Sequence, residues 1–279
     1  MRRVPPHAYF VGSAIFHYLG PAFAVLLFVR VDALGVAWLR IASAAAVFAL
    51  WRRPWRTLRT LDRRTLLAWG AVLALMNCSF YLAIDRLPLA TVAAIEFLPV
   101  VGLAALGART PRNAAALLLA VPGVYLLTGI RLEGEPLGVA LAFANAALFA
   151  LYIVLAHRAA QGAGVDALGM AMLVAAVAVT PLAGPAALPA LADPVALVAG
   201  VGVGISSSVI PYVFDQLAMA RLPRATYALL VSLLPATAAV IGVIVLGQVP
   251  SLAEAGGVML VIAGVALHRA PEPAPAPAG

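Results

Sequence analysis

The stretch VDALGVAWL at residues 31–39 has a near copy, VDALGMAML, at residues 165–173. Seven of the nine positions are identical, and the two copies begin 134 residues apart. The residue that follows is different, because Arg40 comes after the first copy and Val174 after the second. The repetition indicates a duplicated unit in which the shared phrase begins a helix, and the difference marks a point where the two units diverged.

Further matches keep nearly the same offset along the chain. LAIDRLPLAT at residues 82–91 resembles LAMARLPRAT at residues 217–226, which is 135 positions later. Tyr18 corresponds to Tyr152 at an offset of 134. A unit of about 134 residues therefore occurs twice.

The composition is that of an integral membrane protein. Of the 279 residues, 64% are hydrophobic and only 10% are charged, whereas soluble domains carry about 25% charged residues. The net charge of +7 results from 18 arginines and 11 acidic residues. Most of the arginines lie in short loops between apolar runs. We therefore expect a lipid bilayer rather than nucleic acid as the surrounding partner.

Ten apolar runs are long enough to span a bilayer, which takes about 17–25 residues as a helix. They are continuous rather than alternating, which favours helices over strands. The sequence predicts an all-α membrane protein with ten transmembrane helices. The runs are 9–29, 34–51, 66–86, 88–108, 112–130, 136–156, 165–184, 194–218, 223–247 and 250–268.

Each unit contains five of these runs. Residues 1–134 hold the first five, residues 135–269 hold the second five, and residues 270–279 form a Pro/Ala tail that we expect to be disordered. Because five is odd, the second unit enters the membrane from the opposite side. Such inverted repeats are typical of secondary transporters, whose halves rock about a site between them and give alternating access.

The arginines predict the orientation of the chain. With the N-terminus inside, 14 arginines lie on the internal side, three on the external side at positions 30, 86 and 131, and Arg40 within a span. Positive charge in short loops marks the cytoplasmic side. Both ends of the chain are therefore expected inside.

Two charges inside the predicted spans call for an explanation, because a charge at the centre of a membrane helix costs about 2.5–3.5 kcal/mol or more. Arg40 lies about 9 Å and Glu96 about 12 Å from the external ends of their helices, six residues beyond Leu34 and eight beyond Pro88. Both are replaced by valine in the second unit, which suggests that they act together. They are either a buried salt bridge or a site for a zwitterion whose carboxylate meets Arg40 and whose ammonium meets Glu96, or they pair only in the empty carrier.

Further polar side chains are candidates for the wall of a central cavity. Asn77 and Tyr81 are four residues apart and share one face of the third span. Tyr18 and its counterpart Tyr152 lie in the first and sixth spans, and Tyr212 lies in the eighth. Aromatic packing is the alternative for the tyrosines, and His17 is interpreted as a packing residue.

Prolines inside the spans predict kinks. Each one removes a backbone hydrogen bond, so Pro21, Pro99, Pro211 and Pro235 are candidate hinges around the cavity, with a static bend as the alternative.

Other function classes find little support in the residues. An intramembrane enzyme would need paired aspartates, a Ser/His dyad or an aspartate-rich magnesium loop, and a channel would need repeated filter residues. Nucleotide-binding and metal-ligand motifs are missing from the sequence, and Cys78 is the only cysteine. We expect no enzyme and no cofactor, a small-molecule substrate, and a monomer or homodimer.

Several short motifs carry a resemblance to a known group of transporters. They are Leu39-Arg40, Met76–Leu82 leading to Leu87-Pro88-Leu89, Glu96-Phe97 with Pro99, and Ile210-Pro211-Tyr212 leading to Arg221-Leu222-Pro223. Together they resemble the EamA-type family of the drug/metabolite transporter superfamily, and within it the bacterial exporters of threonine, homoserine and aromatic amino acids.

The resemblance implies a ten-helix carrier of the bacterial inner membrane that exports amino acids or similar small metabolites, with general drug or metabolite efflux as the alternative. The chain departs from the family pattern at three positions where an acidic residue is common, which here are Ala108, Leu234 and Gln248. If those acids couple transport to ions in relatives, this chain lacks that means of coupling.

Overall fold

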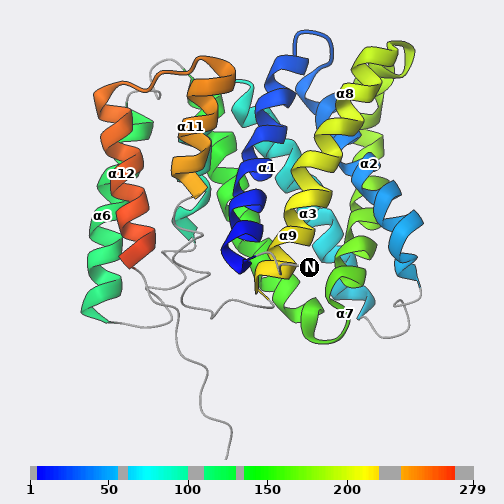
Figure 1. Ribbon diagram of the computed structural model, residues 1–279, viewed down its shortest axis with the longest axis horizontal. Helices are drawn as coiled ribbons and strands as arrows, with labels where there is room; N and C mark the ends of the chain where they lie inside the picture. Colours follow the sequence, from blue (N-terminus) through cyan, green and yellow to red (C-terminus); the bar gives the residue numbers. More distant parts are fainter. Residues whose placement is uncertain (1–4, 56–61, 100–109, 130–134, 220–233, 268–279) are drawn as a thin grey trace, which may run out of the picture.

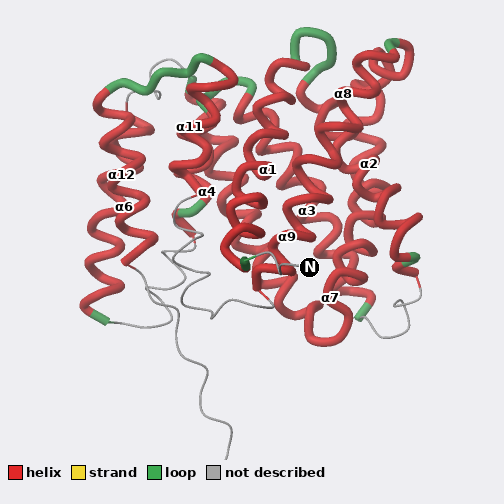
Figure 2. The backbone as a smooth tube through the Cα atoms, viewed as in Figure 1, coloured by secondary structure: helices red, strands yellow, loops and turns green. Residues whose placement is uncertain are grey.

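The computed structural model describes residues 5–55, 62–99, 110–129, 135–219 and 234–267, and within these ranges no strand occurs (Figures 1 and 2). The all-helical prediction is confirmed. The helices are α1 Pro6–Leu27, α2 Ala33–Arg52, α3 Arg63–Ile84, α4 Leu89–Glu96, α6 Pro111–Gly129, α7 Pro136–Ala192, α8 Pro194–Gly204, the π-helix η2 Ile205–Val209, α9 Ile210–Met219, α11 Leu234–Leu246 and α12 Leu252–Leu267.

Apart from α7, which joins the runs 136–156 and 165–184 and continues to Ala192, the fully described helices follow the apolar runs to within a few residues. The runs 88–108 and 223–247 are described only in part, as α4 and α11. The tail 270–279 lies outside the described residues. So do nine of the 17 arginines that set the predicted orientation, at positions 2, 3, 56, 59, 109, 131, 221, 224 and 269.

Among the residues that the structure describes, five helical segments are long and apolar enough to cross a membrane: Ala8–Leu27, Ala33–Arg52, Arg63–Ile84, Val165–Ala192 and Pro194–Asp215. Their outer faces, and those of neighbouring helices, expose large apolar side chains. Leu118, Val177 and Ile244 are each 75% exposed. Such a surface suits lipid rather than water.

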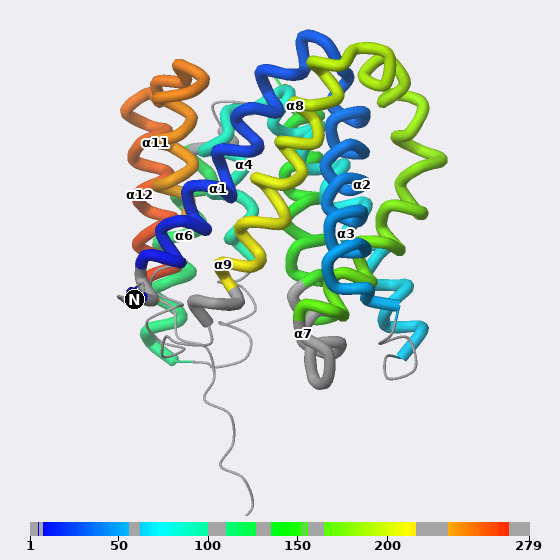
Figure 3. The backbone as a smooth tube through the Cα atoms, turned by 45° about the vertical axis from the view of Figure 1, so that its right-hand side comes forward, coloured from blue at the N-terminus to red at the C-terminus, as the bar shows by residue number. Residues whose placement is uncertain are grey.

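Helix α7 covers two of the predicted spans. A straight helix of its 57 residues would be about 86 Å long, far more than the roughly 30 Å hydrocarbon core. Figures 1 and 3 show that it turns back on itself, so that a first arm, residues 136–152, and a second arm, residues 165–192, run in opposite directions. The second arm packs against α2 and α3.

Aspartates begin three of the helices. Asp32 accepts a hydrogen bond from Leu34 N at 2.8 Å, and Asp62 accepts one from Thr65 N at 2.9 Å. Asp193 accepts from Val195 N and Ala196 N at the start of α8. The Ala196 N–H, and after it the Arg30 guanidinium, hold the pKa of the Asp193 carboxyl below its usual range.

The sequence suggested that VDALG begins a helix in both copies, but this is true only of the first copy. Asp32 of the first copy caps α2, but Asp166 of the second copy lies inside the continuous helix α7. The preceding residues are already helical, so no N-terminal N–H groups need a cap there. The carboxylate of Asp166 instead accepts a hydrogen bond from Arg52 Nε at 2.7 Å and ties the second arm to the end of α2.

Glycines let helices from the two halves approach closely. A Cβ added to Gly70 of α3 would collide with the side chain of Val174 in the second arm of α7. A Cβ added to Gly204 of α8 would lie 2.7 Å from the carbonyl oxygen of Arg40 in α2. At a third crossing, a Cβ on Gly123 of α6 would lie 2.8 Å from the carbonyl oxygen of Gly257 in α12.

Candidate functional site

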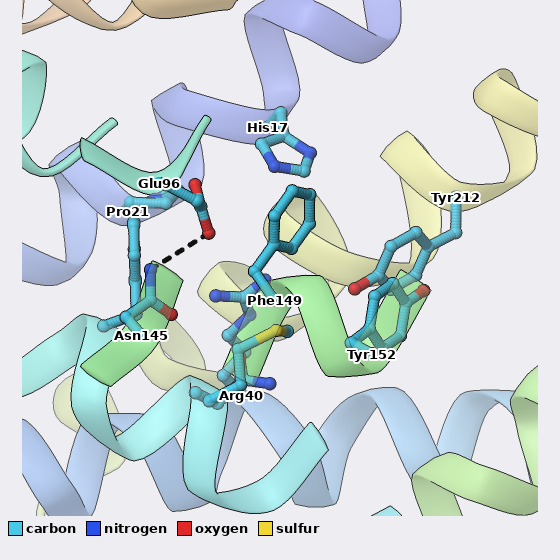
Figure 4. A pocket seen from close by; sticks show the side chains of 11 residues that line it. His17, Pro21, Arg40, Glu96, Asn145, Phe149, Tyr152 and Tyr212 are labelled. Carbon is cyan, nitrogen blue, oxygen red and sulfur yellow. Dashed lines mark hydrogen bonds between the residues drawn. The ribbon is translucent and has the colours of Figure 1, made fainter. Parts of the chain in front are cut away.

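The two intramembrane charges, Arg40 and Glu96, face a common cavity (Figure 4). Its volume is about 50 Å³. One water needs about 10–15 Å³ on this measure, so the cavity has room for about four groups of that size. Side chains from both halves line it: His17, Pro21, Arg40, Met76, Asn77, Phe80, Glu96, Asn145, Phe149, Tyr152 and Tyr212.

Arg40 is held by the π-helix η2. Its Nε donates to Ser208 Oγ at 3.0 Å, and its Nη2 donates to the carbonyl oxygen of Ser207 at 3.2 Å. The guanidinium carbon lies 5.4 Å from the centroid of the Tyr81 ring, within the range of a cation–π interaction. The residue is only 7% exposed, so these contacts replace most of its hydration.

The local sequence explains why a carbonyl is available to Arg40. Pro211 has no N–H, so it cannot donate the helical hydrogen bond to the carbonyl of Ser207, four residues earlier. The backbone between Ile205 and Val209 widens into a π-helix, a form that occurs often at functional sites. Gly204, one residue before it, lets α8 approach the backbone of Arg40.

Glu96 is the last residue of α4, and a neutral partner holds its carboxylate. Its Oε1 accepts a hydrogen bond from Asn145 Nδ2 in the first arm of α7 at 3.1 Å (Figure 4). In the described part of the chain no ion pair joins Arg40 to Glu96. Each charge instead contacts a neutral partner on the other half of the protein, Ser208 for Arg40 and Asn145 for Glu96.

The remaining predicted site residues lie at or beside the cavity. Asn77, Tyr152 and Tyr212 line it, although Asn77 Nδ2 also donates to the Leu73 carbonyl of its own helix at 2.8 Å. Tyr81 lies against the guanidinium of Arg40. Tyr18 does not line the cavity; it is fully buried, and among the described residues its hydroxyl has no hydrogen-bond partner.

The four prolines occupy different settings. Pro21 lies inside α1 and lines the cavity. Pro99 follows the end of α4 by three residues, and Pro235 is the second described residue of α11. The carbonyl of Pro211 accepts a hydrogen bond from Ser13 Oγ of α1 at 3.2 Å, so this proline is tied to a neighbouring helix.

Sequence reasoning missed two parts of the site. Asn145 is an amide in the middle of an apolar run, and the argument that singled out Asn77 would have found it too. His17 was interpreted as a packing residue, but it lines the cavity and its ring also meets the Tyr18 ring edge-on at 5.3 Å.

One departure from the family pattern has a structural role. The side-chain oxygen of Gln248, just after α11, accepts a hydrogen bond from Leu89 N at 3.1 Å. It therefore satisfies a free N–H at the start of α4, the helix that carries Glu96.

The arrangement is suited to binding rather than to bond-breaking chemistry. It presents one cation and one anion, each fixed by a neutral partner, in a cavity bordered by aromatic rings. Among the described residues no group of three or more His, Cys, Asp or Glu side chains could hold a metal ion.

Three kinds of comparison with known proteins each give matches. A profile of the EamA-like transporter family matches residues 136–269. The threonine/homoserine exporters RhtA of Salmonella typhimurium and Escherichia coli are each 34% identical to the chain over 233 residues, or 82% of this chain and 79% of each relative. A crystal structure of another protein superposes with a TM-score of 0.60 at 20% identity, covering 95% of this chain and 96% of that one, which shows a shared fold.

Proposed function

Since the chain belongs to the EamA-like family of the drug/metabolite transporter superfamily, we propose that it is a secondary transporter of the bacterial inner membrane that exports amino acids. Threonine and homoserine, named for its relatives, are the first substrates to test. The observation that carries the proposal is the pair of opposite charges, Arg40 and Glu96, that face one cavity without pairing with each other.

A free amino acid carries both of the groups that such a cavity would recognise. Its carboxylate would bind the guanidinium of Arg40, and its ammonium would bind the carboxylate of Glu96. The volume of about 50 Å³ suits these two groups and leaves little room for a large side chain. A small amino acid such as threonine therefore suits the cavity better than a large one.

The transport mechanism in this proposal is alternating access by two inverted five-helix repeats, residues 1–134 and 135–269. Three helix crossings support the repeat. Gly70 contacts Val174, and Gly204 contacts Arg40. Gly204 is the counterpart of Gly70, and Val174 is the counterpart of Arg40, each 134 residues later, so the two contacts are related by the repeat. In the same way Gly123 meets Gly257, which is its own counterpart 134 residues later.

The direction of the helices supports inversion. In Figure 1, α1 rises from the end where the N-terminus lies, whereas the first arm of α7, its counterpart, descends toward that end. We place both chain ends on the cytoplasmic side, as the arginines indicate. Pro21, Pro99, Pro211 and Pro235 are the proposed hinges of the rocking motion.

The proposal is tested by uptake into inside-out membrane vesicles, in which export appears as accumulation. A panel of labelled amino acids and apolar amines is offered with and without a pH gradient, and vesicles without the protein serve as the control. Accumulation of threonine or homoserine above the control is expected. If the vesicles accumulate apolar amines but no amino acid, the protein is a general efflux carrier and the proposal fails.

A further inference from the structure

We infer that Ser208 and Pro211 are positioning residues that turn the guanidinium of Arg40 so that one particular edge of it meets the substrate carboxylate. The inference rests on the proposed function and deepens it. Neither residue needs to touch the substrate, because both act through Arg40.

A guanidinium group has two edges that can bind a carboxylate with two parallel hydrogen bonds. The side edge consists of Nε and Nη2, and the end edge consists of Nη1 and Nη2. In Arg40 the side edge is already occupied, by Ser208 Oγ on Nε and the Ser207 carbonyl on Nη2. Only the end edge remains for a ligand, since among the described residues Nη1 has no hydrogen-bond acceptor.

The hold on the side edge depends on two features of one short segment. Ser208 supplies a hydroxyl that accepts from Nε. Pro211, by lacking an N–H, leaves the Ser207 carbonyl free to accept from Nη2. Any other residue at 211 would bring a backbone N–H that competes for this carbonyl.

Tyr81 fixes the plane of the group from a third direction. Its ring lies beneath the guanidinium, with 5.4 Å between the guanidinium carbon and the ring centroid. The Tyr81 ring contacts one face of the guanidinium, and Ser207 and Ser208 hold its side edge. The guanidinium of Arg40 therefore has little freedom to rotate. A planar carboxylate that approaches the end edge can then form two hydrogen bonds without first reorienting the arginine.

This arrangement predicts selectivity for carboxylate over a neutral amide. A carboxylate accepts from both Nη atoms, whereas a primary amide offers one acceptor and two donors, and its donors would face the N–H groups of Arg40. An orienting segment sharpens this difference, because an arginine free to swing could meet the amide oxygen alone.

The test is threonine uptake and its inhibition by threoninamide, measured in vesicles with the full-length protein. Ser208→Ala is compared with Ser206→Ala, a matched control whose hydroxyl donates to the Val203 carbonyl and does not reach Arg40. We expect Ser208→Ala to raise KM for threonine about 5- to 10-fold with kcat nearly unchanged, and to reduce the preference for threonine over threoninamide by a similar factor. Pro211→Ala should reduce that preference about 3-fold, and Ser208→Thr should restore it.

The outcomes separate this inference from the proposed function. If wild-type protein transports threonine and Arg40→Met abolishes transport, but Ser208→Ala keeps the preference of Ser206→Ala, the positioning role is refuted and the transporter remains. If wild-type protein transports no amino acid, the proposed function itself fails. Thermal unfolding in detergent checks that each variant is folded, and an unfolded Ser208→Ala is replaced by Ser208→Cys.

Discussion

The phrase VDALG occurs at the start of helix α2 and at the start of the second arm of α7, but the two helices have different roles. The residue that follows each nine-residue phrase lies where a glycine lets two helices cross closely. Arg40 lies beside Gly204, and Val174 lies beside Gly70. Val174 fills the crossing with an apolar side chain. Arg40 instead turns toward the cavity, where Ser208 and Tyr81 hold its guanidinium.

In the proposed duplication, the two halves contribute different groups to one asymmetric site. The first half supplies the two charges, Arg40 and Glu96, and the second half supplies their neutral partners, Ser208 and Asn145. A buried charge with neutral partners stays available to a ligand, whereas a buried salt bridge would have to be broken before binding. In the proposed duplication, divergence between the halves would supply the binding chemistry, and the symmetry that was kept would supply the helix packing around it.

The largest effect is expected from the charge that only α2 carries. Arg40→Met should reduce threonine uptake at least 30-fold, because it removes the group that binds the carboxylate. Val174→Met, the equivalent change in the second arm, should leave uptake within about 2-fold of wild type. Initial rates in inside-out vesicles measure both, and equal losses in the two variants would contradict the asymmetric account.

The second effect concerns the two crossing glycines. Gly204→Ala should reduce uptake about 10-fold, because the new Cβ would lie 2.7 Å from the backbone oxygen of Arg40 and would push the guanidinium from its place. Gly70→Ala should mainly lower the unfolding temperature, since the side chain of Val174 can shift. Uptake and thermal unfolding of both variants are compared, and an uptake loss for Gly70→Ala as large as for Gly204→Ala would show that the crossings are not specialised.

The third effect concerns the neutral partners of the charges. Asn145→Ala should raise KM for threonine about 5-fold, because Glu96 loses the amide that holds its carboxylate. Asn77→Ala is the comparison at the same cavity, and it should raise KM less than Asn145→Ala does, since the Asn77 amide bonds to its own helix rather than to a charge. A reversed order of the two KM values would contradict the assigned roles.

The smallest effect concerns the aspartate that the two copies of the phrase share. Asp32→Ala removes a helix cap and should cost about 1 kcal/mol of stability. Asp166→Ala removes only an ion pair at the surface and should cost less. Unfolding midpoints in detergent at one pH compare them, and the same loss for both would mean that capping of α2 contributes nothing extra.

Much of the fold follows from the sequence because the bilayer imposes simple rules. Length and hydropathy locate the helices, and the cost of burying a charge singles out Arg40 and Glu96. Their partners could not be predicted, because depth along a helix does not say which neighbour a side chain faces. The π-helix at Ile205–Val209 could not be predicted from the sequence either, since it depends on how the backbone widens before Pro211. The prediction of a helix start at the second VDALG phrase was wrong, because the sequence does not distinguish an aspartate that caps a helix from one inside a longer helix.

The central claim is that Arg40 recognises the carboxylate and Glu96 the ammonium of one amino acid. Its most direct test is the stabilisation of detergent-purified protein by three ligands: threonine, threoninamide and N-acetylthreonine. Wild-type protein should prefer threonine to both analogues. Arg40→Met should lose only the preference over threoninamide, and Glu96→Gln only the preference over N-acetylthreonine. If both variants keep both preferences, or if each loses both together, the two charges do not divide the substrate between them and the account is contradicted.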